Sequence, residues 1–198
     1  SFSHKPSAQP GVWFEMDCAL GKVVSDNSWK ATRYDAFWAP EDENPKGPRQ
    51  YRLAGANVGY DARKAVDFAS ADFDDSAWND AIEVSREAAE WGDFVERPIP
   101  HWRWSELLDY QSQTVNSEGA IECALPYNAQ VTPYIRLKAN GGEKIVICTD
   151  DYWIGKARSF KTEYIATAGE QEFETPMWAN GHSVLYYVPQ GGEVLDVK

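Results

Sequence analysis

Tyr60-Asp61-Ala62-Arg63, followed ten residues later by Phe73-Asp74-Asp75-Ser76-Ala77-Trp78, gives the clearest indication of the fold. The first run is typical of a strand at the edge of a β-sheet. In the second run the Asp-Asp-Ser group can hydrogen-bond its own backbone and close a turn. The Phe and Trp on either side of that turn can bury large apolar faces. Together the two runs predict an anchored corner of a β-sandwich, and neither carries a catalytic arrangement.

Length and composition favour a globular protein with an aromatic interior. The chain has 198 residues, which is enough for one large domain or two small ones, each with its own core. Nine Trp and only two Met indicate that rings fill the interior and any clefts. Because an aromatic ring can also stack on the C–H face of a sugar, each Trp is open to a core role or a sugar-binding role.

The net charge of −12 and the pI of about 4.7 argue against two classes of partner. A chain this acidic repels phosphate backbones and anionic membrane surfaces. We therefore expect neither a nucleic-acid partner nor a membrane partner, whereas a neutral ligand remains compatible with the charge.

The cysteines and histidines are widely spaced: Cys18, Cys123 and Cys148, and His4, His101 and His182. An odd number of cysteines leaves at least one thiol free, and no histidine stands at a zinc-ligand spacing from another or from a cysteine. We expect no metal from these residues. Calcium is the alternative cofactor, because carboxylates cluster at Asp72, Asp74 and Asp75, although their spacing does not match an EF-hand loop.

The chain is expected to be all-β, with two jelly-roll-like β-sandwich lobes and few short helices. Residues 1–11 are rich in Ser, Pro and Gly and predict a linker or a disordered segment. The first lobe covers residues 12–108, with a short helix at 86–91. The second covers residues 109–198 and can be an incomplete sandwich, because the chain ends in a strand-like pattern and begins without Met, as a fragment would.

Six short runs predict the strands of the second lobe: 121–125, 134–139, 144–149, 161–167, 171–174 and 183–188. Asn140-Gly141 is a strong hairpin signal, and Gly191-Gly192 predicts a similar turn. In the first lobe, residues 12–20 and 81–84 predict strands, with a hairpin turn at Gly21.

The candidate ligand-binding residues are an aromatic and polar group. If a sugar binds, Trp153 and Trp178 are the expected stacking platforms, with Asp150, Asp151 and His182 as partners for its hydroxyl groups. The run from residue 178 to residue 182 predicts a turn in which a glycine adopts positive φ.

A glycosidase would need two carboxylates across the bound sugar. The candidates are Asp150, Asp151, Glu172 and Glu174. Strand alternation places the two glutamates on one face and Phe173 on the other, which is also the pattern of a half-buried strand with a solvated face.

Several motifs occur in a recognisable order: Asp26-Asn27-Ser28-Trp29-Lys30, Gly59-Tyr60-Asp61-Ala62-Arg63, Phe73 to Trp78, Arg97-Pro98-Ile99-Pro100, Gly169 to Glu174, and Trp178 to His182. In this order they resemble the N-terminal β-domains of bacterial α-L-rhamnosidases, glycoside hydrolase family 78, over residues 12–198. One departure is that the family usually has Gly-Glu before Tyr-Asp-Ala-Arg, whereas this chain has Val58-Gly59.

The resemblance implies a multidomain parent enzyme that hydrolyses terminal α-L-rhamnosyl groups with inversion. In that family the reaction takes place in an (α/α)6 barrel C-terminal to the β-domains, and nothing in this chain matches the catalytic segments of the barrel. The resemblance therefore implies no catalytic residue here, an inactive fragment, and the barrel of the same parent chain as partner. A periplasmic or secreted location is favoured for the parent.

Three functions remain open at this point. The lobes can be a scaffold that orients the barrel and walls one side of its cleft. They can instead be an autonomous carbohydrate-binding module for a rhamnose-containing polysaccharide, with calcium as an optional cofactor. The least favoured alternative is an autonomous glycosidase built on the four carboxylates named above.

Overall fold

The protein is described by a computed structural model that covers residues 11–19, 21–41, 57–85, 88, 93–101, 103–151, 153–154, 157–158 and 160–198. This part of the chain is nearly all β, which confirms the predicted fold class. By their contacts the residues form two units, Ser1–Tyr34 with Asp67–Trp104 and Asp35–Val66 with Ser105–Lys198. The predicted division after residue 108 stays a prediction. No helix among the described residues is long and apolar enough to cross a membrane.

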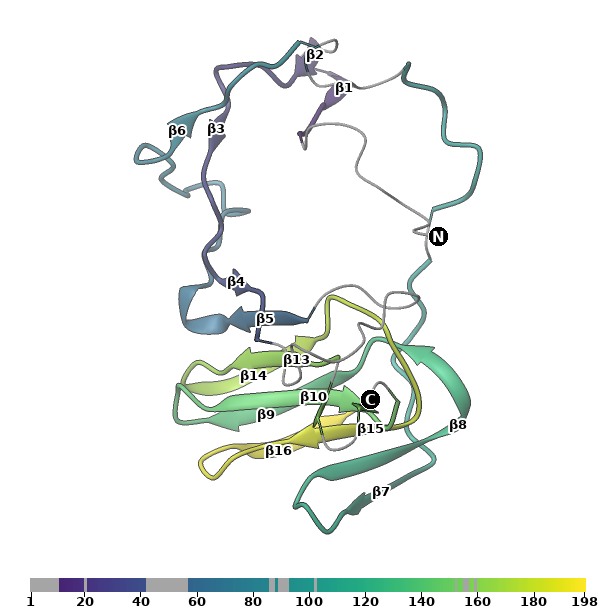
Figure 1. Cartoon of the computed structure of the whole chain (residues 1–198). Coiled ribbons are helices and arrows are strands. Elements are labelled where there is room, and N and C mark those ends of the chain that lie inside the picture. The colour runs from purple at the N-terminus through teal and green to yellow at the C-terminus, as the bar shows by residue number, and fades with distance from the viewer. Residues whose placement is uncertain are drawn as a thin grey trace. The chain divides into compact units, whose positions relative to one another are not determined.

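The first unit contains two short antiparallel ribbons (Figure 1). Its strands are β1 (Glu15–Cys18), β2 (Gly21–Val24), β3 (Lys30–Ala31) and β6 (Asn79–Asp80). β1 pairs with β2 and ends at the Cys18–Gly21 pair, where Gly21 has φ 111°, as the predicted hairpin requires. No described residue of this unit is buried, so strand pairing, turns, surface polar contacts and ring contacts hold it together.

The Phe73–Trp78 corner has the predicted structure. Oδ1 of Asp74 accepts a hydrogen bond from the backbone N–H of Ser76 at 3.0 Å, and the N–H of Trp78 donates to the carbonyl oxygen of Asp75 at 2.8 Å. The rings of Phe73 and Trp78 then meet edge to face with their centroids 5.3 Å apart. The corner is thus closed by backbone and aromatic contacts together.

Two predictions in the first unit have different outcomes. The predicted strand at 81–84 is wrong, because β6 ends at Asp80 and residues 81–85 form no ladder. After the β3–β6 pair the N–H of Ala81 still donates to the carbonyl oxygen of Trp29 at 2.7 Å, and Glu83 accepts a bond from the N–H of Asn27 at 3.0 Å. These contacts hold the segment in place without strand pairing.

The predicted helix at 86–91 lies outside the described residues, apart from residue 88.

The second unit is a β-sandwich of a seven-stranded and a three-stranded sheet, plus a two-stranded ribbon (Figure 1). The larger sheet has the order β4-β5-β13-β10-β15-β8-β7 and the smaller sheet the order β14-β9-β16. Neighbouring strands are antiparallel except β5 and β13, which are parallel. The strands are β4 (Phe37–Trp38), β5 (Val58–Asp61), β7 (Ser112–Val115), β8 (Ile121–Val131), β9 (Tyr134–Ala139), β10 (Lys144–Thr149), β11 (Trp153–Ile154), β12 (Ala157–Arg158), β13 (Thr162–Ile165), β14 (Gly169–Glu174), β15 (Ala179–Tyr187) and β16 (Glu193–Val197).

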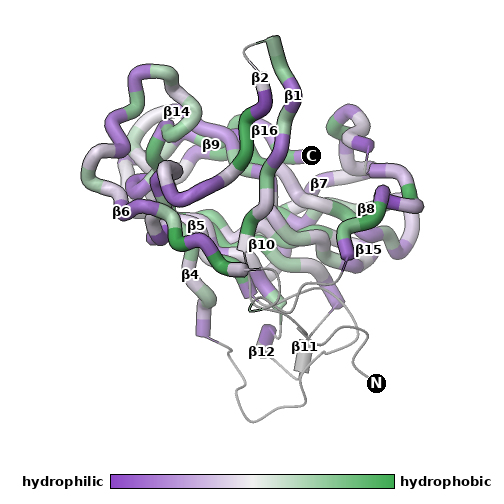
Figure 2. Tube along the Cα trace, turned by 90° about the horizontal axis from the view of Figure 1, so that it is seen from above, coloured by the Kyte–Doolittle hydropathy of each residue, from purple (hydrophilic) through white to green (hydrophobic). Residues whose placement is uncertain are grey.

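Both sheets contribute to one hydrophobic core. Ile145 and Tyr186 come from the larger sheet, Ile135 and Leu137 come from the smaller sheet, and all four are buried. Burial alternates along β9 and β14, as strands with one buried face require, and polar and apolar residues both lie along the strands (Figure 2). Phe173 packs against this core while its neighbours on β14 are exposed, which confirms the predicted solvated face of that strand.

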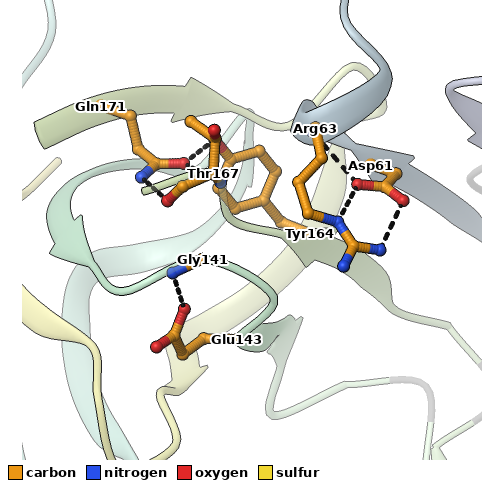
Figure 3. Close-up of polar contacts among 7 residues, drawn as sticks. All are labelled: Asp61, Arg63, Gly141, Glu143, Tyr164, Thr167 and Gln171. Carbon is orange, nitrogen blue, oxygen red and sulfur yellow. Dashed lines mark hydrogen bonds and ion pairs between the residues drawn. The ribbon is translucent and has the colours of Figure 1, made fainter. Parts of the chain in front are cut away.

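The predicted hairpin at Asn140-Gly141 is wrong. β9 pairs only with β14 and β16, and β10 only with β13 and β15, so residues 140–143 carry the chain from one sheet to the other. The carboxylate of Glu143 accepts a bond from the N–H of Asn140 at 3.1 Å. It accepts another from the N–H of Gly141 at 2.7 Å (Figure 3). Gly191-Gly192 likewise joins β15 to β16 across the sandwich. Glycine-rich turns therefore serve as crossovers between the two sheets in this fold.

Candidate functional site

A polar cluster forms where β10 ends beside the middle of β15. Asp150 is the first residue after β10, and its N–H donates to the carbonyl oxygen of Ser183 at 3.1 Å. Its Oδ1 accepts bonds from the N–H of His182 at 2.7 Å and the N–H of Ser183 at 2.9 Å. One carboxylate oxygen thus fixes the end of β10 to the backbone of β15.

β15 is irregular at this point. Gly181 pairs with Ala129 of β8 and Ser183 pairs with Ala124. Four residues of β8, 125–128, therefore lie opposite a single residue of β15, His182. Such an irregularity leaves backbone groups unpaired and redirects a side chain. The carboxylate of Asp150 satisfies the backbone N–H groups that the irregularity frees.

The prediction of a turn over residues 178–182 is wrong, because Ala179–Tyr187 is strand β15. Gly181 has no positive φ; it is needed because there is no room for a side chain. A Cβ there would lie 2.5 Å from Oδ1 of Asp150 and 2.7 Å from Cβ of Thr149. The glycine lets the end of β10 approach β15 closely.

A second carboxylate completes the cluster. Oδ2 of Asp151 accepts a hydrogen bond from the side-chain amide of Asn180 at 2.9 Å, and the same amide contacts Asn128 of β8. Nδ1 of His182 lies 3.6 Å from Oδ2 of Asp150, and the side chain of His182 is 63% exposed. One possible ligand atom from each of the two aspartates and the histidine lies within 4.8 Å of the others. The fold therefore brings together three of the predicted polar residues.

The two predicted stacking residues, Trp153 and Trp178, lie on different parts of the chain. Trp178 is half-buried and stands directly before β15, two residues from Asn180. Trp153 begins β11 and pairs there with Arg158 of β12, and its side chain lies outside the described part of the structure. Their roles as stacking platforms stay predictions.

Asn128, Asn180 and Tyr127 are the members of this region that sequence reasoning missed. Asn128 and Tyr127 belong to the four-residue excursion of β8, and Tyr127 is 70% exposed. Pro126 inside an otherwise strand-like run was the available signal, because proline is tolerated in a strand mainly at edges and irregularities.

Among the other predicted acidic residues, Glu174 and Asp74 make structural hydrogen bonds. Glu174 accepts a bond from the hydroxyl of Thr132 at 2.6 Å, and Glu172 lies exposed on the same face of β14. Asp74 uses one carboxylate oxygen in its turn. A calcium site at Asp72, Asp74 and Asp75 stays a prediction.

An ion pair between a buried carboxylate and a half-exposed guanidinium lies at the end of β5, apart from this cluster. The carboxylate of Asp61, which is 4% exposed, binds the guanidinium of Arg63 with both oxygens, at 2.8 Å to Nε and 2.9 Å to Nη2 (Figure 3). Oδ1 of Asp61 also accepts the N–H of Arg63 at 3.1 Å and caps the 3-10 helix Ala62–Lys64. The Arg63 side chain, followed by its backbone N–H, lowers the pKa of Asp61 although burial opposes this shift. The motif is a structural clamp.

Comparisons with known proteins indicate the fold. No family model matches the chain, and no curated protein matches it. Among solved structures, an α-L-rhamnosidase from Dictyoglumus thermophilum matches with a TM-score of 0.65 and 18% identity over 92% of this chain. A family GH78 rhamnosidase of Bacillus sp. GL1 matches with a TM-score of 0.34 and 16% identity over 42% of this chain and 10% of that chain. This chain spans 21% of the length of the Dictyoglumus chain, so it shares the fold of one portion of a larger protein.

Proposed function

We propose that this chain is a non-catalytic β-sandwich portion of an α-L-rhamnosidase-like glycoside hydrolase, and that it supports a catalytic (α/α)6 barrel in the parent chain. The observation that carries the proposal is the likeness to the Dictyoglumus α-L-rhamnosidase over 92% of this chain. The ordered motifs of the sequence resemble the same enzyme family independently of that likeness.

The placements of three candidate carboxylates support a scaffold role. A catalytic acid of a glycosidase needs surroundings that keep it protonated, which a desolvated cleft provides. Glu172 and Glu174 stand exposed on one face of β14, and Asp150 has one oxygen committed to two backbone N–H groups. These placements serve folding better than proton transfer to a sugar.

The test compares the 198-residue chain with the natural polypeptide that carries it, using p-nitrophenyl α-L-rhamnopyranoside. We expect turnover only by the natural polypeptide, with inversion of the anomeric centre seen by proton NMR. Turnover by the 198-residue chain, or a natural polypeptide with no rhamnosidase activity, would overturn the proposal.

Carbohydrate binding is the second candidate. It is favoured by the cluster of Asp150, Asp151 and His182, which Asn180 adjoins, and by the exposed Tyr127 in the β8 segment opposite His182. Planar polar side chains near an aromatic ring are the usual components of a sugar site. Calorimetric titration with L-rhamnose and a rhamnose-containing oligosaccharide tests this candidate. Saturable heat that Asp151→Asn removes would support a binding module, and no heat at millimolar sugar would leave the scaffold alone.

A further inference from the structure

We propose that Asp150, Asp151 and His182 form a binding site for a zinc-like divalent cation. The inference does not depend on the enzyme class of the parent. It starts from the observation that, among the described residues, these three form the only group of carboxylates, imidazoles and thiols whose possible ligand atoms converge within 4.8 Å. Sequence spacing gave no sign of it, because the histidine lies 32 residues from Asp150 and belongs to β15, whereas Asp150 follows β10.

The separation of the histidine from the first carboxylate fits a shared cation. Nδ1 of His182 and Oδ2 of Asp150 are 3.6 Å apart, which is too long for a direct hydrogen bond. Zinc binds imidazole nitrogen and carboxylate oxygen at about 2.0–2.2 Å, so two ligands at a tetrahedral angle stand about 3.4 Å apart. The imidazole and the carboxylate are thus separated by nearly the distance that a common metal ion imposes.

Each aspartate has one oxygen held by the protein and the other available. Asp150 places Oδ1 against the N–H groups of His182 and Ser183, which leaves Oδ2 on the side of the imidazole. Asp151 places Oδ2 against the amide of Asn180. Hydrogen bonds of this kind orient ligands before the metal arrives, and in metal sites their loss typically costs 10–100-fold in affinity.

The types of ligand atom indicate which class of ion would bind. One imidazole nitrogen with two carboxylate oxygens suits zinc and similar transition-metal ions, whereas calcium prefers six to eight oxygen ligands. Three protein ligands on an exposed surface leave a fourth position for water. The ion would tie the connection after β10 to the irregular part of β15.

The test is calorimetric titration of the untagged 198-residue chain with zinc chloride. We expect saturable one-to-one binding that His182→Gln and Asp151→Asn each weaken by about tenfold or more. His101→Gln is the matched control, because it removes an exposed histidine outside the cluster, and it should leave the affinity unchanged. Binding that survives His182→Gln, or that His101→Gln weakens equally, would overturn the proposal, as would heat that never saturates.

A second measurement needs no variant. In proton NMR of the unaltered chain, zinc should shift the imidazole resonances of His182 at one equivalent, while those of His4 and His101 stay in place. Equal shifts of all three histidines would show non-specific surface binding and overturn the site. Neither outcome bears on rhamnosidase activity, which the assay of the natural polypeptide decides separately.

Discussion

The indole of Trp38 lies against Gly59 in the space that a Cβ on residue 59 would occupy. The two residues pair across β4 and β5, at the edge of the larger sheet. This contact accounts for Gly59 at the position where the family that the sequence resembles usually has Glu before Tyr-Asp-Ala-Arg. A glutamate at position 59 would meet the indole ring, so the departure follows from packing.

Gly59→Ala should therefore destabilise the second unit. Overpacking a close contact typically costs about 1–3 kcal/mol. The free energy of unfolding in urea measures the effect, and the same substitution in a Trp38→Ala background should cost much less, because the indole is then absent. A loss below about 0.5 kcal/mol for Gly59→Ala alone would contradict the packing explanation.

The Asp61–Arg63 clamp should make stability depend on pH in the acid range. Because the pKa of Asp61 is lowered in the folded state, its contribution is complete above the unfolded value of about 3.9. It is lost as the pH falls below that value and through the folded pKa. Asp61→Asn should remove this part of the acid dependence and cost about 1–3 kcal/mol at neutral pH. Unfolding curves between pH 7 and pH 3 measure both effects, and parallel curves for the two proteins would contradict the account.

The three thiols should differ in reactivity. Cys18 is exposed, whereas Cys123 and Cys148 are buried, and burial raises the pKa of Cys123 to about 12. Because the thiolate is the reactive form, a thiol reagent such as DTNB should label one cysteine of the folded chain and all three in denaturant. Cys18→Ser should abolish labelling of the folded chain. Labelling of Cys123 or Cys148 without denaturant would show that the core opens more readily than the packing indicates.

Tyr186→Phe should weaken the core of the sandwich. The fully buried hydroxyl of Tyr186 lies 2.7 Å from that of Tyr110 and donates to the carbonyl oxygen of Tyr134 at 3.0 Å. Removing it leaves buried polar groups without partners, at a cost of about 1–3 kcal/mol. Tyr187→Phe is the control, because its hydroxyl bonds to Glu118 nearer the surface, and it should cost less. Equal costs for the two variants would contradict the role given to the buried pair.

The same buried tyrosine should affect alkaline stability. Burial, followed by the neighbouring hydroxyl of Tyr110, raises the pKa of Tyr186 above its ordinary value of about 10. Its contribution is therefore complete below pH 10 and is lost as the pH rises toward the folded pKa. Tyr186→Phe should flatten the decline of the unfolding free energy above pH 10, and an unchanged decline would contradict this.

Sequence reasoning succeeded where the interacting groups are neighbours along the chain. The Asp74–Ser76 turn and the hairpin at Gly21 depend on hydrogen bonds between residues only a few positions apart. The all-β class followed from short runs between turn residues. These features need no knowledge of which strands pair.

Features that depend on strand pairing could not be predicted in this way. Asn140-Gly141 has the composition of a hairpin turn, but the strands on either side of it, β9 and β10, belong to different sheets. Asp150 and His182 were named as candidate residues, yet their contact arises because β10 and β15 are neighbours. The amides of Asn180 and Asn128 were missed for the same reason, since their partners lie far away in sequence.

The scaffold role is tested most directly by deleting residues 1–198 from the natural polypeptide and measuring hydrolysis of p-nitrophenyl α-L-rhamnopyranoside together with the melting temperature. The account predicts that the truncated protein is insoluble, or melts at a lower temperature with reduced activity, because the proposed barrel would have lost the β-portion that supports it. A truncated protein with the full activity and melting temperature of the natural polypeptide would contradict the account.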